Sequence, residues 1–342
     1  MIIPRFWSSA KQKHKDKQGQ MTIQRWGWSS VSQDEANRHA QFRLEQAMEE
    51  ALKVWPKRPT RTHEQKLAYN GAEGLPIREE IIEEYPEGII TRNSYGALCL
   101  NVPSTLILDL DEDDFLAVPK TWKKALWLGV LVLATLITWV VRANVEQFPQ
   151  GIFPGANVIC FVVAFVMSKI VVFSMHNVLR NLWIKSQGGV VGWAKKRMDK
   201  AIQLEPGYWV VYKTPAGARV IGAHCAFDPQ SPETQKWMNF FKVDPLYQKM
   251  CHRQNCFRAR VSAKPWRIPN GPQRWRSGVW PLSEDQQLKR KEWVKAYEAV
   301  AKNHAACRLM AVSQNCPIAL DQRQVIDIHD THSQSKTTKP LA

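Results

Sequence analysis

The sequence predicts an α+β fold, an antiparallel sheet with flanking helices, interrupted by a two-helix transmembrane hairpin. Two long apolar runs, 125–141 and 156–175, stand in a chain that is otherwise polar, with 23% charged residues and a mean hydropathy of −0.36. Around them, strand-like and helix-like segments follow in the order β-β-insert-α-β-β-α-β. This order is typical of one antiparallel sheet with helices on one face.

The first 60 residues are expected to contain a tail and a helix. Residues 1–24 carry four lysines between positions 11 and 17 and lack the apolar segment of a signal peptide, which predicts a disordered basic tail. Residues 25–60 form an N-terminal helix, because Ser32 and Glu35 match a capping box and helix-forming residues continue to about Trp55.

Residues 61–119 are expected to form the first part of a cytoplasmic α+β domain. A short acidic helix is predicted over Ile77–Tyr85, and two extended segments follow it, Ile89–Asn101 and Thr105–Asp111. The second extended segment is apolar until it ends in DLDEDD, as expected of a buried strand.

Residues 120–187 are predicted to form the transmembrane hairpin. The run ALWLGVLVLATLITWVV has seventeen residues without a charge, and a helix needs ~20 mostly apolar residues to cross the bilayer. Lysine and arginine flank both outer ends, so the positive-inside tendency places both termini in the cytoplasm and the protein in the inner membrane. The alternative is a hairpin buried in a soluble core or in a partner. Lys169 favours that alternative, because a charge in mid-membrane is costly.

Residues 188–332 are expected to complete the cytoplasmic domain, and 333–342 to form a polar tail. A turn at Pro215-Ala216-Gly217 predicts a β-hairpin. The expected elements are a helix over 191–203, strands over 209–213 and 219–225, a helix over 232–241, a strand over 257–261, a helix over 283–303, a strand over 308–312 and a helix over 318–330.

Composition indicates the class of partner. The chain has 47 Lys+Arg against 31 Asp+Glu, a net charge of +16, which favours contact with nucleic acid, nucleotide phosphates or anionic lipid. Seven irregularly spaced cysteines exclude a secreted disulfide framework and do not match a zinc site. They are predicted to be buried free thiols in a reducing compartment.

The DLDEDD run suggests a metal site. Asp109 and Asp111 are two apart on a predicted strand, so their carboxylates leave the same face ~6–7 Å apart and can hold Mg²⁺ or Mn²⁺ for phosphoryl transfer. An ordinary acidic loop is the alternative. The β-hairpin predicted around Pro215-Ala216-Gly217 can bring Lys213, Arg219 or His224 beside these acids, where they would bind a substrate phosphate. The alternative is an ordinary turn whose Lys and Arg are solvated.

A basic and aromatic stretch, residues 249–276, contains eight Lys or Arg and no acid. Guanidinium groups bind phosphates bidentately and aromatic rings stack on unpaired bases, so the stretch predicts binding of single-stranded nucleic acid or a nucleotide. A cationic face resting on lipid headgroups is the alternative. The candidate residues are Arg258, Arg260, Lys264, Arg267, Arg276, Trp266 and Trp275.

Two resemblances accompany these motifs. The strand with its D-x-D and the hairpin with its small-residue turn resemble the palm core of archaeo-eukaryotic-type primases, which implies metal-dependent nucleotidyl transfer. The chain departs from that pattern, because Arg219 stands where the family has a histidine. The strings ITRNSYGA, DPLY, FRARVSAKPWR and the terminal HD…PLA resemble an uncharacterised bacterial family, which implies no activity.

Three functions therefore stay open at this point. The first is a membrane-anchored protein whose basic cytoplasmic domain binds nucleic acid or a phosphorylated ligand. The second is a divalent-metal-dependent nucleotidyl- or phosphotransferase with Asp109 and Asp111 as ligands. The third is a membrane-associated scaffold without catalysis, so the sequence does not decide whether the protein is an enzyme.

Overall fold

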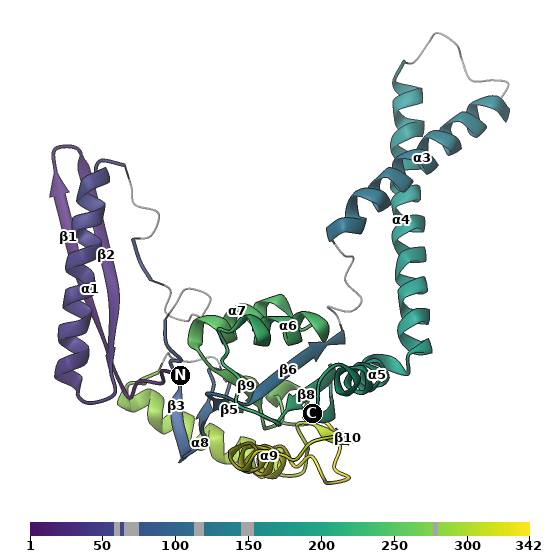
Figure 1. The fold of residues 1–342 in the computed structure, drawn as a ribbon. Helices are drawn as coiled ribbons and strands as arrows, with labels where there is room; N and C mark the ends of the chain where they lie inside the picture. Colours follow the sequence, from purple (N-terminus) through teal and green to yellow (C-terminus); the bar gives the residue numbers. More distant parts are fainter. Residues whose placement is uncertain (58–61, 65–74, 113–119, 145–153, 276–279) are drawn as a thin grey trace. The chain divides into compact units, whose positions relative to one another are not determined.

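The computed structural model describes residues 1–57, 62–64, 75–112, 120–144, 154–275 and 280–342 (Figure 1). The chain divides into two compact units. Unit 1 comprises residues 1–110 and 194–342, and unit 2 comprises residues 111–193. Antiparallel sheets and helices make up unit 1, so the expected α+β class is confirmed.

One four-stranded antiparallel sheet of unit 1 has the order β3-β4-β5-β9. Its strands are β3 (Glu80–Tyr85), β4 (Gly88–Arg92), β5 (Leu98–Val102) and β9 (Phe257–Arg260). The prediction of a helix over 77–85 is wrong, because Glu80–Tyr85 form the edge strand β3 of this sheet. The single strand predicted over 89–101 is two strands, because the chain turns at Asn93–Ala97.

The second four-stranded sheet has the order β10-β7-β8-β6. Its strands are β6 (Leu106–Asp111), β7 (Tyr208–Thr214), β8 (Gly217–Gly222) and β10 (Arg308–Gln314). The β7–β8 hairpin and its turn lie where the sequence predicts them. The expectation of one sheet is wrong. The chain builds two, and the Tyr247 hydroxyl lies between them, 2.9 Å from the Ile107 carbonyl of β6 and 3.0 Å from the Arg258 carbonyl of β9.

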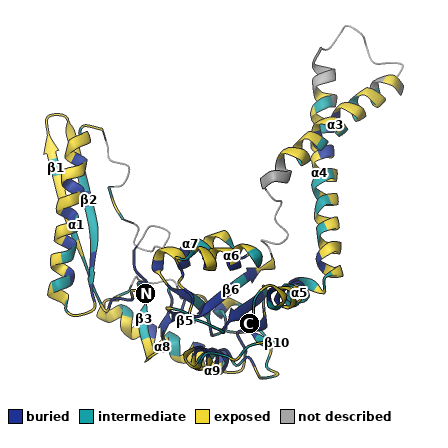
Figure 2. Ribbon diagram, viewed as in Figure 1, coloured by how far each residue is buried: buried dark blue, intermediate teal, exposed yellow. Residues whose placement is uncertain are grey.

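Helices pack beside the two sheets. Strands β4, β5, β6, β7 and β8 are mostly buried, whereas the edge strands β3 and β10 are not (Figure 2). The predicted helices are present as α5 (Gly189–Leu204), α6 (Pro232–Phe240), α8 (Glu284–Ala301) and α9 (Leu320–Ser333). A further helix, α7 (Pro245–Gln254), was not predicted. Its signals are Asp244, whose carboxylate caps the first turn, and Asn255, which ends the helix in the left-handed region.

The N-terminal segment is folded, which corrects the expectation of a disordered tail. β1 (Phe6–Asp16) and β2 (Gly19–Ser29) form an antiparallel ribbon, and α1 (Gln33–Val54) packs on one face of it. Ser32 caps α1 by accepting from the Glu35 amide, as its sequence predicts. Gly27 lets the helix approach, because a Cβ there would lie 2.1 Å from the Ala40 nitrogen.

The last residues also pack into unit 1. Ala305 pairs with Leu341 in an isolated β-bridge, and Ala342 is buried beside Tyr297 of α8. The segment predicted as a polar tail thus contributes to the core around α8.

Unit 2 is built from two long helices, α3 (Lys120–Asn144) and α4 (Pro154–Ser186), that pack on each other as a hairpin. Their spans Lys124–Val141 and Phe161–Ser186 are long and apolar enough to cross a membrane, and only 11% and 17% of these residues are buried. The buried residues are small or medium in size, including Ala134, Ala164 and Ser168, as is common where transmembrane helices cross. Most of these residues are therefore exposed, as Figure 2 shows, and the hairpin is consistent with two membrane-spanning helices.

Lys169, which interrupts the second apolar run, has a partner within the hairpin. Its ammonium group lies 5.5 Å from the centre of the Trp127 ring, and Phe165 stacks on the same tryptophan at 5.9 Å. A cation–π contact of this kind offsets part of the cost of placing the charge among apolar side chains. The lysine is therefore compatible with a membrane-spanning helix.

Candidate functional site

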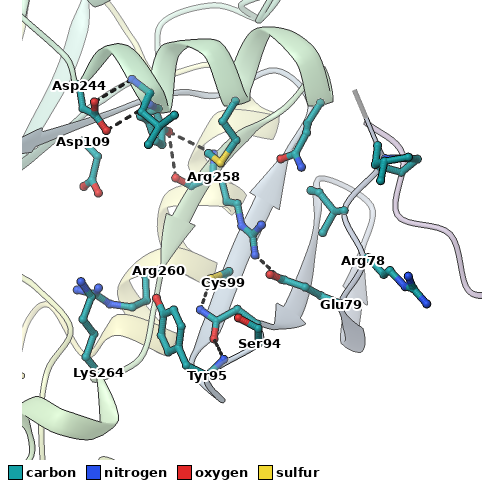
Figure 3. A pocket seen from close by; sticks show the side chains of 18 of the residues that line it. Arg78, Glu79, Ser94, Tyr95, Cys99, Asp109, Asp244, Arg258, Arg260 and Lys264 are labelled. Carbon is teal, nitrogen blue, oxygen red and sulfur yellow. Dashed lines mark hydrogen bonds and ion pairs between the residues drawn. The ribbon is translucent and has the colours of Figure 1, made fainter. Parts of the chain in front are cut away.

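Unit 1 contains a cavity of about 330 Å³ between the β3-β4-β5-β9 sheet, β6, α7 and the chain just before β3 (Figure 3). Four cationic and three acidic side chains line it, together with three aromatic rings, Trp7, Tyr95 and Tyr247. The charged residues are Arg78, Arg258, Arg260 and Lys264, and Glu79, Asp109 and Asp244. How these charges pair decides what the cavity can bind.

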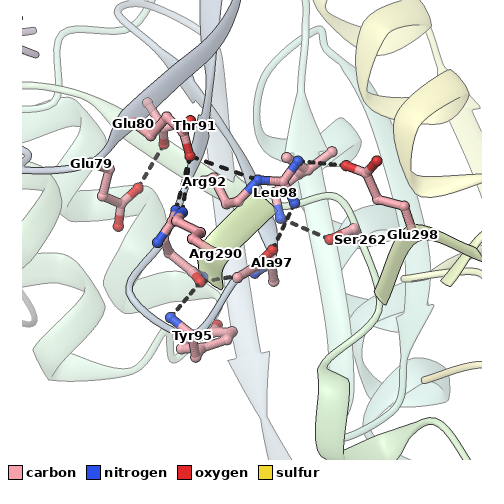
Figure 4. Close-up of polar contacts among 12 residues, drawn as sticks. Glu79, Glu80, Thr91, Arg92, Tyr95, Ala97, Leu98, Ser262, Arg290 and Glu298 are labelled. Carbon is pink, nitrogen blue, oxygen red and sulfur yellow. Dashed lines mark hydrogen bonds and ion pairs between the residues drawn. The ribbon is translucent and has the colours of Figure 1, made fainter. Parts of the chain in front are cut away.

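A tight turn presents Tyr95 to the cavity. The Asn93 side chain accepts hydrogen bonds from the amides of Tyr95 and Ala97, at 3.2 and 3.0 Å, and so holds the turn between β4 and β5 (Figure 4). Gly96 has φ +95°, and a Cβ there would lie 2.2 Å from the Trp293 ring. Glycine is thus required both by the backbone conformation and by the close approach of α8.

Two ion pairs between buried arginines and more exposed glutamates hold the turn against α8. Arg92 at the end of β4 donates to Glu298 of α8 at 2.6 Å and to the Gly96 carbonyl at 3.0 Å. Arg290 of the same helix pairs with Glu80 at 3.1 Å (Figure 4). These contacts join α8 to β3 and β4 and fix the wall that carries Tyr95.

Arg258 lines the cavity but is already neutralised. Its guanidinium donates to the Glu79 carboxylate, and the two side chains are only 11% and 13% exposed. Burial alone would lower the pKa of Arg258, but the Glu79 carboxylate raises it well above its ordinary value. Arg258 therefore acts as a structural cation that ties β9 to the segment before β3.

Arg78 is the opposite case. Its guanidinium lies 3.8 Å from the centre of the Trp26 ring and 4.8 Å from that of Trp7, and it donates to the Trp280 carbonyl. Among the described residues no carboxylate lies within ion-pair distance of it, and burial lowers the pKa of Arg78 to about 10. The side chain remains charged at neutral pH, so an anion in the cavity would be stabilised by it.

Arg260 is the second such cation. It lies two residues after Arg258 on β9 and lines the same cavity. Its Nε is buried and has no acceptor among the described residues. A phosphate oxygen is the acceptor that a guanidinium nitrogen binds best, as a charge-assisted hydrogen bond.

Aromatic and cationic side chains continue from the cavity along the chain after β9. The Tyr95 and Trp266 rings pack edge to face at 5.0 Å, and the Arg274 guanidinium lies 5.8 and 5.4 Å from their centres. The Lys264 ammonium lies 5.5 Å from the Trp266 ring, which is 48% exposed. An exposed ring flanked by cations can stack on a base while the cations contact its phosphate.

Asp109 is committed to an ion pair. Its carboxylate accepts from Arg219 Nε at 3.2 Å, and Arg219 is fully buried on β8. The second Arg219 contact is to the Arg260 carbonyl at 3.0 Å, which links β8 to β9. Arg219 therefore stabilises the junction of the two sheets. Its charge is balanced by Asp109, and its side chain does not line the cavity.

A buried polar network continues from Arg219. His329 Nε2 lies 3.2 Å from Arg219 Nη1, so Nε2 is the acceptor and Nδ1 donates to Asp330 at 3.1 Å. Cys307 Sγ lies 3.9 Å from the same Nε2. Burial would raise the pKa of the Cys307 thiol, but His329 and Arg219 lower it overall. Cys307 and His329 are both fully buried, so this arrangement of Cys, His and Asp stabilises the core.

The remaining sequence candidates lie apart from the cavity or outside the described residues. Lys213 is exposed near the β7–β8 turn, and Trp275 packs against Trp293 at 6.0 Å. Arg267 belongs to a short 3₁₀ turn and does not line the cavity. Arg276 lies outside the described residues.

The metal prediction is not tested by the arrangement of these residues. Asp111 ends β6 and is exposed. Within the described part of the chain, no three His, Cys, Asp or Glu side chains come together as a metal site would require. The pairing of Asp109 with Arg219 removes charge that a divalent cation would need. The Mg²⁺ or Mn²⁺ site therefore stays a prediction.

Sequence reasoning placed Arg258, Arg260, Lys264 and Trp266 at or beside one site but missed Arg78 and Tyr95. Both missed residues lie more than 150 positions earlier in the chain, within the strings LPIREE and RNSYG. In the sequence, Arg78 stands directly before two acids, Glu79 and Glu80, and Tyr95 stands before the glycine of a turn. Neither pattern indicates a site until the order of the strands in the sheet is known. Comparison with protein-family models, curated proteins and solved structures finds no match.

Proposed function

We propose that this protein binds the nucleotide unit of a phosphate-bearing ligand, free or in single-stranded nucleic acid, while its hairpin anchors it in a membrane. The observation that carries the proposal is that Arg78 and Arg260 line one cavity without a carboxylate partner among the described residues. A buried cation without an anion costs free energy, which a bound phosphate would offset.

The aromatic side chains support a nucleotide over inorganic phosphate. Tyr95 lines the cavity and contacts Trp266, which is exposed and flanked by Lys264 and Arg274. Stacking on such rings is worth about 1–3 kcal/mol per base. The alternative of metal-dependent nucleotidyl transfer has less support, because Arg219 already neutralises Asp109.

The test uses the full chain in nanodiscs of neutral phosphatidylcholine, with a fluorescent oligothymidylate as the probe and ATP and inorganic phosphate as competitors. Arg260→Gln removes a charged hydrogen bond worth about 1.5–3 kcal/mol, so it should weaken binding about tenfold or more. Trp266→Ala should weaken the oligonucleotide and ATP but leave phosphate unchanged. Lys213→Gln is the matched control, because it removes an exposed cation outside the cavity. Equal affinity of Arg260→Gln and wild type would exclude the cavity as the site.

For the hairpin we propose two transmembrane helices with both flanks in the cytoplasm, so that the protein resides in the inner membrane. Exposed apolar surface on both helices and the basic residues at their outer ends support this topology. The protein should stay with the membrane fraction after alkaline carbonate extraction. Cysteines introduced by Lys57→Cys and Lys302→Cys should both be labelled only from the cytoplasmic side. Labelling from opposite sides would contradict the topology, and release by carbonate would contradict the anchor.

A further inference from the structure

We propose that the β1–β2 ribbon binds double-stranded DNA, inserting into the major groove the face that is turned away from α1. This site is separate from the cavity and takes a different ligand, so it goes beyond the function proposed above. It rests on the folded state of residues that the sequence presents only as a basic tail.

The strand register decides which side chains share that face. Ala10 packs against the cluster formed by Met21, Ile23 and α1, so it points toward the helix. Neighbouring side chains in a strand point to opposite faces. Lys11, Lys13 and Lys15 therefore point away from α1, and all three are exposed.

The partner strand adds polar groups to the same face. Directly opposite the three lysines lie Gln24, Thr22 and Gln20, respectively. The one acid of the ribbon, Asp16, is bound on the other face, where it accepts from Trp55 Nε1 at 2.7 Å and from the Gly19 amide at 3.1 Å. Among the described residues of β1 and β2, this face is thus cationic and polar and carries no carboxylate.

Its dimensions fit duplex DNA. The major groove is about 12 Å wide and admits a two-stranded ribbon, and alternate residues of a strand are about 6.8 Å apart, so successive lysines can reach successive phosphates. Gln20 and Gln24 lie on β2, opposite Lys15 and Lys11, and their side-chain amides can bind the donor and acceptor edges of adenine. Double-stranded RNA is a poorer fit, because its major groove is too narrow for side chains to read.

A lipid surface is also a poorer fit than DNA. Stable binding at a membrane interface needs apolar side chains buried among the headgroups as well as positive charge. At the three residue pairs Lys11–Gln24, Lys13–Thr22 and Lys15–Gln20, this face presents only lysine, glutamine and threonine. The aromatic residues of the ribbon lie at its other end, where Trp7 and Trp26 contact Arg78.

The experiment measures binding of a fluorescent 20-base-pair duplex to the full chain in phosphatidylcholine nanodiscs as salt is raised. The variant K11Q/K13Q/K15Q removes the ribbon's charge, and K289Q/K291Q/K295Q removes the same charge from the exposed face of α8. Each phosphate contact contributes about 0.9 to the slope of log affinity against log salt. The ribbon variant should therefore lose nearly three units of slope, and the α8 variant should keep the wild-type slope.

Acetylation of lysines distinguishes the ligands. Protection of Lys11, Lys13 and Lys15 by the duplex in neutral discs supports the proposal. Protection only in discs that contain phosphatidylserine would assign the face to lipid and overturn it, and so would an unchanged slope in K11Q/K13Q/K15Q. Arg260→Gln should leave duplex binding unchanged, so failure of the cavity proposal and failure of the ribbon proposal give different results.

Discussion

The arginines of unit 1 that pair with a carboxylate and the two cavity arginines that do not are the same residue type in different electrostatic settings. Arg92 and Arg219 are buried, Arg258 is 11% exposed, and each binds a carboxylate, on Glu298, Asp109 and Glu79. Arg78 and Arg260 line the cavity without such a partner among the described residues. The first group joins secondary-structure elements, whereas the second group is left with binding capacity.

The difference shows that the position of the carboxylates decides which arginines are neutralised within the fold and which keep a charge that a ligand could balance. A buried cation paired with an acid has its charge balanced within the fold. A partly buried cation without an acid has a charge that a ligand can balance. Substitution of a paired arginine should therefore lower the stability of the fold, whereas substitution of an unpaired cavity arginine should weaken ligand binding.

The largest effect is expected at a paired arginine. Arg258→Met leaves Glu79 buried without its partner, and breaking a buried ion pair typically costs about 3–5 kcal/mol. The free energy of unfolding, measured by urea denaturation of the full chain in detergent, should fall by that amount. The double variant Arg258→Met with Glu79→Gln should recover much of the loss. If the single variant were as stable as wild type, the structural role of the paired arginines would be wrong.

The next largest effect is expected at Gly96, in the turn that carries Tyr95 and packs against α8. Gly96→Ala places a methyl group against the Trp293 ring and a side chain at φ +95°. Overpacking costs about 1–3 kcal/mol and the left-handed backbone about 1–2 kcal/mol. A loss of about 2–5 kcal/mol in the free energy of unfolding should follow. Ser94→Ala, in the same turn, is the control and should leave stability unchanged; an equal response of both would contradict the packing argument.

A smaller effect depends on pH. Asp330 accepts from His329 Nδ1 and pairs with Lys336 at 3.2 Å. Burial would raise the pKa of Asp330, but the His329 hydrogen bond lowers it overall. A lowered pKa stabilises the fold above the unfolded value of about 3.9, and this stabilisation disappears as pH falls through the folded value. The stability gap between wild type and Asp330→Asn should thus narrow below about pH 4. A constant gap from pH 7 to pH 3 would show that Asp330 does not titrate in this way.

Much of the fold could be predicted from local sequence. The β7–β8 hairpin follows from its Pro-Ala-Gly turn, α1 from the Ser32 cap, and the apolar hairpin from its length and lack of charge. β3 was mistaken for a helix because IREEIIEEY suits both, and pairing with β4 decides between them. The β1–β2 ribbon was missed because its stability comes from packing against α1, a contact that no local pattern reveals.

The candidate site could be predicted only in part for a similar reason. The density of cations and aromatic residues after β9 identified Arg260, Lys264 and Trp266. It could not show that Arg258 is paired and Arg260 is not, because the partner of Arg258, Glu79, is 179 positions away in the sequence. The two residues meet only in the folded chain. Arg219 was expected beside the acids but was assigned to a substrate phosphate, because its direct pairing with Asp109 depends on β6 and β8 being neighbours.

The smallest effect on stability, and the sharpest test of the comparison, is expected at Arg260. Arg260→Gln removes a cation whose Nε has no acceptor among the described residues, so no ion pair is broken and the free energy of unfolding should change by less than about 0.5 kcal/mol. The same substitution should abolish most of the stabilisation that the oligothymidylate gives to wild type, measured as the rise in melting temperature with probe concentration. Because ligand stabilisation grows with the ratio of free ligand to Kd, a tenfold weaker Kd lowers it by about 1.4 kcal/mol at saturating probe. A large loss of stability without the probe would place Arg260 with the structural arginines, and the distinction between the two regions would then fail.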